Sequence, residues 1–132
     1  MSKQNPTDRV YSQDHEWVKD NGDDTVVVGI TAYAQEMLTD IVFVELPPIG
    51  KKVTKGDSVA VVESVKSVSD VYAPVSGEVI AVNNKLEEEP ALINQDAFGE
   101  GWIVKMRLTN PVELKSLLST ADYEKLIKEE KH

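Results

Sequence analysis

Hydrophobic positions along the chain fall into short runs that are rich in valine and isoleucine. Glycine, proline or aspartate stands near the ends of each run, and such residues favour turns. The clearest runs are 25–30, 41–46, 58–63, 77–82 and 102–108. In the last run, apolar residues at the even positions alternate with Lys105 and Arg107, which is typical of a half-buried strand. The pattern therefore predicts a mainly β protein built from short strands.

Helical patterns are confined to short segments. Residues 32–38 predict a short helix with Thr31 as its N-cap. Near the C-terminus, the Asn-Pro pair at 110–111 predicts the start of a helix that runs through Leu118. Ser119, with an aspartate three residues later, indicates a further helix start. These C-terminal helices are expected to cover one side of the sheet.

The stretch 83–101 shows neither the alternation of a strand nor the apolar spacing of a helix, and it is predicted to be irregular. Its acidic segment 87–90 is expected to be a solvated corner, and 99–101 is expected to be a turn into the last strand. Two other segments, 56–61 and 77–82, align weakly with each other. Two similar strands on either side of a central turn would fit a pseudo-symmetric flattened barrel, whose closure hides strand edges. The alternative is a chance similarity between valine-rich strands.

Lys66 lies at the turn between two valine-rich strands. The neighbouring Ser64 and Ser67 are small, and Val65 and Val68 are expected to anchor the turn. A lysine at the tip of a tight hairpin is accessible to an enzyme that must surround it. This position indicates a site for covalent attachment of a prosthetic group, whereas the alternative is an ordinary solvated lysine.

Length and charge limit the classes of function. The 132 residues, of which 41% are hydrophobic, are expected to form a single domain over 1–132, with a core at about 10–109 and a helical segment at about 110–130. A net charge of −9, from 14 basic and 23 acidic residues, disfavours binding to nucleic acid or to anionic membranes. Proteins and small molecules are the expected partners, and the chain is expected to be a monomer in isolation.

Localisation and metal binding are constrained by what the sequence lacks. No apolar run is long enough to span a bilayer, and residues 1–9 resemble neither a secretory signal nor a transit peptide. The expectation is a cytoplasmic protein, or one of the mitochondrial matrix if the chain is a mature eukaryotic form. With no cysteine and only His15 and His132, disulfides, thiol catalysis, metal centres and histidine-based triads are not expected.

Several segments are specific in their combined order and spacing. They are 15–18, 29–31, 40–47 with Gly50, 63–66 with 69–70, 74–79 with Asn83, 99–102, and the tail 118–129. In these segments the chain resembles the lipoyl-carrying H-protein family of the glycine cleavage system over nearly its whole length. It departs from the family pattern at Asp14, at Thr39, where glycine is usual, and at Gln95 and Ala97, where serine and proline are more common.

The resemblance implies a barrel-sandwich hybrid, a flattened barrel like that of lipoyl domains, with helices at the C-terminus. It implies that lipoic acid is joined by an amide to Lys66, and that a hairpin presents this arm. The hairpin residues are Glu63, Ser64, Val65, Ser67 and Asp70. Lipoate ligase or octanoyltransferase would install the group, and the protein itself would be a carrier without catalytic activity.

The same resemblance implies three enzymes as partners. The carrier would take the aminomethyl group of glycine from glycine decarboxylase (P protein) to aminomethyltransferase (T protein). It would then pass electrons to dihydrolipoyl dehydrogenase (L protein). The chemistry would belong to the cofactors of these enzymes, while Lys66 would supply reach and a covalent tether.

The loaded arm would need protection, because the nitrogen lone pair of the aminomethyl group can expel sulfur unless the nitrogen is protonated. A nearby carboxylate favours the ammonium form. We therefore expect Glu16 and Asp70, with Asp14 alongside, to line a cleft that holds the arm. The alternatives are a solvated loop acid for Glu16 and a turn-capping residue for Asp70. His15 and the two tryptophans are expected to be structural.

Other functions share some of these features. A lipoyl domain of a 2-oxo acid dehydrogenase and a lipoate-relay carrier would present a similar lysine. A biotin carrier typically has methionine on each side of its lysine, whereas Lys66 has Val65 and Ser67. From other classes, the chain could be an interaction domain with an unmodified lysine, or a hydrolase that uses Asp14, His15 and Glu16. The hydrolase lacks a nucleophile elbow and a nucleophile next to a base.

Overall fold

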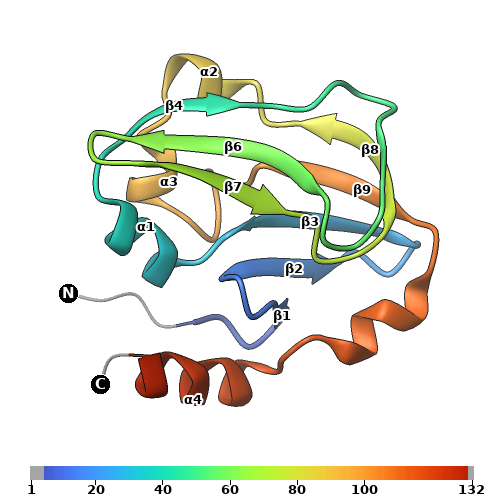
Figure 1. Ribbon diagram of the computed structural model, residues 1–132. Coiled ribbons are helices and arrows are strands. Elements are labelled where there is room, and N and C mark those ends of the chain that lie inside the picture. Colours follow the sequence, from blue (N-terminus) through green and yellow to red (C-terminus); the bar gives the residue numbers. More distant parts are fainter. Residues whose placement is uncertain (1–4, 131–132) are drawn as a thin grey trace.

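The computed structural model describes residues 5–130 as two β-sheets with helices at their margins (Figure 1). The larger sheet has six strands in the order β1-β2-β3-β9-β8-β5, and the smaller has three in the order β4-β6-β7. Neighbouring strands pair antiparallel in both sheets. The strands are β1 Val10–Tyr11, β2 Glu16–Asp20, β3 Thr25–Ile30, β4 Ile41–Glu45, β5 Lys52–Val53, β6 Ser58–Ser64, β7 Val68–Tyr72, β8 Gly77–Val82 and β9 Val104–Leu108.

The helices are short except for the last one. They are α1 Ala32–Leu38, α2 Lys85–Glu88, α3 Leu92–Gln95, the 3₁₀ helix η1 Pro111–Ser116 and α4 Thr120–Glu130. The predicted helix at 32–38 is confirmed, and the hydroxyl of Thr31 accepts the backbone N–H of Ala34 at 3.2 Å as the predicted N-cap. Within residues 5–130, no helix is both long and apolar enough to cross a membrane.

The predicted helix after residue 110 is wrong in type and length. Asn110 forms no side-chain cap, and η1 ends at Ser116 because the backbone of Leu117 is extended. Leu118 instead forms an antiparallel bridge with Tyr11. The N–H of Leu118 donates to the carbonyl oxygen of Tyr11 at 2.7 Å, and the N–H of Tyr11 donates to that of Leu118 at 2.8 Å. This pairing prevents the helix from continuing. The second predicted start is confirmed, because the hydroxyl of Ser119 accepts the N–H of Asp122 at 3.2 Å.

Strands with regular alternation are where the pattern predicts them, but less regular segments differ. The predicted strands 25–30 and 77–82 are confirmed with the same bounds. β2 was not predicted because its two apolar residues are adjacent and both buried, so it does not alternate. The stretch 83–101, expected to be irregular, contains α2 and α3, whose Leu86 and Ile93 are fully buried.

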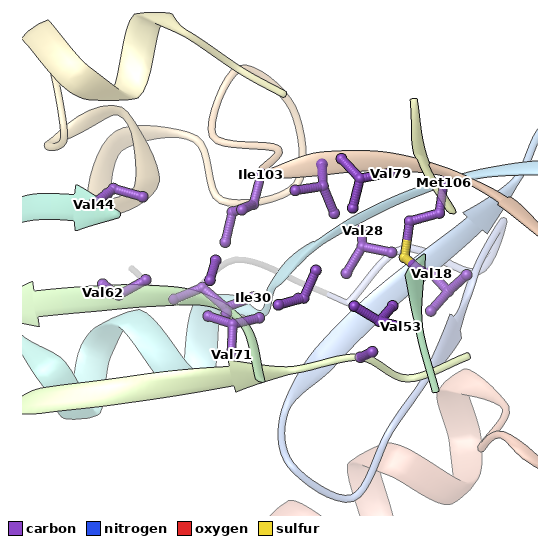
Figure 2. Packing of buried hydrophobic residues seen from close by; sticks show 14 of the residues in the cluster. Val18, Val28, Ile30, Val44, Val53, Val62, Val71, Val79, Ile103 and Met106 are labelled. Atoms are coloured by element: carbon purple, nitrogen blue, oxygen red, sulfur yellow. The ribbon is translucent and has the colours of Figure 1, made fainter. Parts of the chain in front are cut away.

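One apolar interior lies between the sheets. Figure 2 shows valine, isoleucine and methionine side chains from strands of both sheets meeting in it. Val62 and Val71 of the smaller sheet and Val28 and Val79 of the larger sheet are at most 2% exposed. Side chains that alternate along each strand thus place one face of each sheet in a shared core.

The fold class is confirmed as mainly β with short helices and a C-terminal helix. The closure of the barrel is not observed. The similar segments 56–61 and 77–82 contribute to β6 and β8, which belong to different sheets, and each sheet keeps two edge strands among the described residues. The edge strand β4 carries a bulge between Ile41 and Phe43, an irregularity that disfavours pairing with another chain.

The C-terminal helix packs beside β1 at one edge of the larger sheet (Figure 1). Tyr123 is fully buried, and its ring stacks on that of Tyr11 with centroids 4.6 Å apart. Its hydroxyl lies 2.7 Å from the hydroxyl of Thr31 and 2.8 Å from Nδ1 of His15. The helix is therefore held to the sheet both by apolar contact and by a buried polar network.

Thr39 ends α1 in a conformation that suits glycine. Its φ of 66° and ψ of −145° lie outside the regions that β-branched residues favour. The side chain of Asn94 bridges the backbone of this turn. Its amide N–H donates to the carbonyl oxygen of Thr39 at 2.8 Å, and its amide oxygen accepts the N–H of Ile41 at 2.9 Å. The surrounding contacts hold Thr39 in a strained conformation.

We expect Tyr123→Phe to lower the free energy of unfolding by about 1–3 kcal/mol, because the buried groups of His15 and Thr31 lose a hydrogen-bonding partner. Urea unfolding measures the change. Tyr72→Phe is the matched control, since the hydroxyl of Tyr72 forms no hydrogen bond within residues 5–130 and the side chain is partly exposed. Equal stabilities of the two variants would contradict the role of the network.

We expect Thr39→Gly to raise the free energy of unfolding by about 1 kcal/mol, because glycine adopts this conformation without steric cost and the relief exceeds its entropic penalty. Thermal and urea unfolding provide the measurement. Thr109→Gly serves as the control, because Thr109 is exposed and its φ is not positive. A loss of stability in Thr39→Gly similar to that of Thr109→Gly would refute the strain.

Candidate functional site

Lys66 is exposed at the turn between β6 and β7, as the sequence predicts. The N–H of Ser64 donates to the carbonyl oxygen of Ser67 at 2.8 Å. The hydroxyl of Ser64 accepts the N–H groups of Ser67 and Lys66 at 3.1 and 3.3 Å. Because one buried serine holds the backbone on both sides of the lysine, the turn is tight and the lysine side chain extends from a fixed point. Figure 1 shows this hairpin projecting at the left of the molecule.

The expectation that Val65 and Val68 anchor the turn is wrong. Their side chains are 68% and 65% exposed. The anchors are polar instead: the hydroxyl of Ser64 donates to the carbonyl oxygen of Ser67 at 3.2 Å, and the N–H of Val65 donates to the carbonyl oxygen of Asp40 at 3.1 Å. Since hydrogen bonds to the backbone fix the turn, its valines are free to face solvent.

The other predicted hairpin residues lie along the same two strands. Glu63 stands opposite Val68 in the register of β6 and β7. Asp70 lies within β7 opposite Val61, and its carboxylate accepts the hydroxyl of Ser58 at 2.8 Å. The alternative reading of Asp70 as a turn-capping residue is therefore not observed, because it pairs within the strand.

A cleft of about 140 Å³ lies between the loop before β2, the helix α1 and the strand β7. It is lined by Asp14, Glu16 and Asp70, the three acids that the sequence predicts to line one cleft. Met37 and Leu38 of α1 contribute an apolar wall that was not predicted. The cleft thus combines three acidic residues with an apolar side, next to the strand that follows Lys66.

Glu16 is only 2% exposed, so it is not a solvated loop acid. Its Oε1 accepts the hydroxyl of Ser12 at 2.5 Å, and its Oε2 accepts the N–H of Tyr72 at 3.1 Å. Burial raises the pKa of Glu16 to about 7; the negative charge of Asp14 adds to this, while both hydrogen bonds oppose it. Because a carboxylate offers about four lone pairs, Glu16 keeps capacity for a further donor.

Ser12 organises the loop in front of the cleft, and sequence reasoning missed it. Its hydroxyl accepts the N–H groups of Asp14 at 3.2 Å and of Glu16 at 3.1 Å. Ser12 stands two residues before one acid and four residues before another. Serine in such a position can form a local turn in which its hydroxyl bonds to the backbone N–H groups that follow. The spacing of Ser12 from the two acids can be seen in the sequence, whereas its burial cannot be predicted from it.

His15 and Trp17 make the structural contacts that were expected of them, and His15 also lines the cleft. His15 adopts a φ of 68°, and its Nδ1 and Nε2 lie 2.8 Å from the hydroxyl of Tyr123 and 3.3 Å from a carboxylate oxygen of Glu130. Trp17 is 2% exposed and donates from Nε1 to the carbonyl oxygen of Ala97 at 3.0 Å. Trp102 is partly buried and packs against the cluster that contains Trp17.

The hydrolase alternative is not supported by this geometry. Asp14 is exposed, His15 is bonded to α4, and Glu16 is bonded to Ser12 and Tyr72, so the three side chains have separate partners. In the described part of the chain, no three histidine or acidic residues are placed to hold a metal ion.

Comparison with known proteins agrees with these features. The family model described as "Glycine cleavage H-protein" matches residues 9–130. The glycine cleavage system H protein of Carboxydothermus hydrogenoformans is 52% identical over 125 residues, which cover 95% of each chain. That of Listeria monocytogenes is 54% identical over 122 residues, covering 92% of this chain and 97% of the relative.

A solved structure extends the likeness to three dimensions. The crystal structure of a glycine cleavage system H protein from Mycobacterium marinum superposes with a TM-score of 0.83 at 40% sequence identity. The match covers 92% of this chain and 97% of the other. The chain therefore belongs to the glycine cleavage H-protein family.

Proposed function

We propose that Lys66 is the residue of this carrier to which lipoic acid is attached, through an amide of its Nζ. Membership of the family makes the chain a lipoyl carrier of the glycine cleavage system and not a catalyst. The observation that carries the assignment to Lys66 is its exposure at a turn whose backbone is fixed by Ser64. A modifying enzyme can surround such a side chain without unfolding the sheet.

The hairpin supplies reach and direction. The hydrogen bonds of Ser64 and the contact of Val65 with Asp40 hold the turn, so the arm starts from one position relative to the body. When attached to Lys66, lipoate would supply a disulfide as the acceptor of the aminomethyl group and a dithiol as the electron donor to the L protein. Tethering at Lys66 raises the effective concentration of that group at each docked partner.

We further propose that the cleft receives the amine-bearing end of the arm. Asp14, Glu16 and Asp70 line the cleft, and negative charge favours the protonated amine. Burial raises the pKa of Glu16 to about 7, and an approaching ammonium group lowers that pKa and favours the charged form of Glu16. Met37 and Leu38 offer an apolar wall for the hydrocarbon part of the arm.

Membership of the family implies that the chain interacts with the P, T and L proteins of the glycine cleavage system. We propose that they act as glycine decarboxylase, aminomethyltransferase and dihydrolipoyl dehydrogenase on one arm, and that lipoate ligase or octanoyltransferase installs it. An acidic carrier with a net charge of −9 fits partners whose docking surfaces are basic. The carrier is proposed to be monomeric between encounters.

We expect the purified chain, incubated with lipoate, ATP and a lipoate ligase, to gain the mass of one lipoyl group. Lys66→Ala removes the acceptor nitrogen and should abolish the gain. Intact mass spectrometry followed by peptide mapping measures both. Lys52→Arg, at an exposed lysine of β5, is the control and should be modified like the parent. A parent chain that stays unmodified, or a Lys66→Ala variant that still gains the group, would overturn the assignment.

We expect Glu16→Gln to speed the spontaneous loss of the aminomethyl group from the loaded arm, because the neutral amide no longer stabilises the ammonium form. The release of ammonia at neutral pH, followed after removal of the decarboxylase, gives the rate. Glu129→Gln is the control, since Glu129 is an exposed acid of α4 outside the cleft. Loss at the parental rate in Glu16→Gln would sink the proposed role of this carboxylate.

A further inference from the structure

Apolar side chains are exposed on the outer surface around Lys66. Phe43, Val65 and Val68 are 49%, 68% and 65% exposed. We refer to these three residues as the hairpin patch. Phe43 and Val68 belong to strands on either side of β6, and Val65 lies in the turn, so the patch spans the smaller sheet next to the lysine.

The register of the sheet places Phe43 and Val68 on one face, and Val65 follows β6 in the turn. Glu63 of β6 pairs with Phe43 on one side and with Val68 on the other, and directly opposite residues share a face. Val42 is the extra residue of the bulge in β4, and both it and Phe43 are exposed. The bulge changes the alternation of β4, so an aromatic ring faces solvent beside the hairpin.

The charges around the patch are mostly of one sign. The strands of the smaller sheet carry the acids Glu45, Glu63 and Asp70, and Lys66 is the one basic residue of these strands and their turn. Acylation converts the Lys66 ammonium group into a neutral amide. A surface that fits this region must therefore be apolar at its centre and basic at its rim.

We infer that the hairpin patch is the docking surface for the enzyme that acylates Lys66, and that Phe43 is its main apolar anchor. The inference rests on the proposed attachment at Lys66 and adds the surface by which the enzyme selects this chain. Large aromatic side chains that become buried in an interface commonly carry a major share of the binding energy. Apolar side chains that gather on a surface are typical of interaction sites.

The chemistry favours the acylating enzyme over the enzymes that use the finished arm. Deprotonated Nζ attacks the carbonyl carbon of an activated acyl group, the C–N bond forms, and the bond to the activating group breaks. That group leaves with the electron pair, and the nitrogen loses its remaining excess proton to solvent. For this step the activated carbonyl must reach Nζ itself, so the enzyme must enclose the turn. Enzymes that use the arm meet its far end instead.

The test is steady-state lipoylation of the full chain by a lipoate ligase with lipoate and ATP. We expect Phe43→Ser to raise the KM for the carrier about tenfold while kcat changes little, since the variant loses docking contacts and not the acceptor. Val65→Ser, a second exposed member of the patch, should raise KM as well. Val112→Ser is the matched control, because Val112 is 60% exposed on η1 and lies outside the smaller sheet.

A second measurement separates docking from distortion of the turn. N-Hydroxysuccinimidyl acetate acylates lysines without a docking surface, and peptide mapping reports the rate at Lys66. This rate should be the same in the parent chain and in Phe43→Ser. A KM for Phe43→Ser equal to that of the parent, or a matching loss of reactivity toward the small reagent, would overturn the inference. If the parent chain accepts no lipoate at all, the attachment proposal itself fails, which is a different outcome.

Discussion

A buried carboxylate links the two sheets at the cleft. Glu16 belongs to the larger sheet, and its Oε2 accepts the backbone N–H of Tyr72 in the smaller sheet at 3.1 Å. A charged or polar group removed from water must find partners inside the protein, or its burial strongly destabilises the fold. The position of β7 next to the loop before β2 is therefore constrained, and with it the position of the hairpin that carries Lys66.

That constraint explains why the cleft lies where it does. Ser12 fixes the loop that leads to Glu16, and Tyr72 fixes the end of β7, so the cleft has one wall from each sheet. The helix α1 closes the third side, and its start is set by the cap at Thr31. Thr31 also contacts Tyr123, so the docking of α4 and the wall of the cleft share one buried network.

The elements that could be predicted from sequence are those whose signal is local. Alternation and turn residues define β3 and β8, and the cap of α1 is visible as Thr31 before a short helical run. β2, α2 and α3 could not be predicted in the same way, because their burial is decided by packing against distant segments. Leu86 and Ile93 reach the core from four-residue helices that carry no periodicity of their own.

The same difference between local signals and distant contacts decides which features of the site could be predicted. The hairpin around Lys66 could be predicted, because two valine-rich strands and a serine-bounded turn are adjacent in sequence. The burial of Glu16 could not, because its partner Tyr72 lies 56 residues away. The exposure of Val65 also departs from expectation, since a hydrophobic residue in a turn gives no sign that polar contacts have already fixed the backbone.

The region near the hairpin inverts the usual arrangement of side chains. A carboxylate is buried at the cleft, while an aromatic ring and two valines are exposed around Lys66. The buried carboxylate and the exposed apolar side chains each lower the stability of an isolated domain. Burial of the valine-rich core offsets this loss. In the functions proposed for them, the two exceptions serve opposite needs of a carrier: the outward apolar surface receives an enzyme that acts on Lys66, and the inward acid faces a cationic group that is shielded from water. Under the proposed function, a fold that places both features along the β6–β7 hairpin would present the same arm for modification and withdraw it for protection.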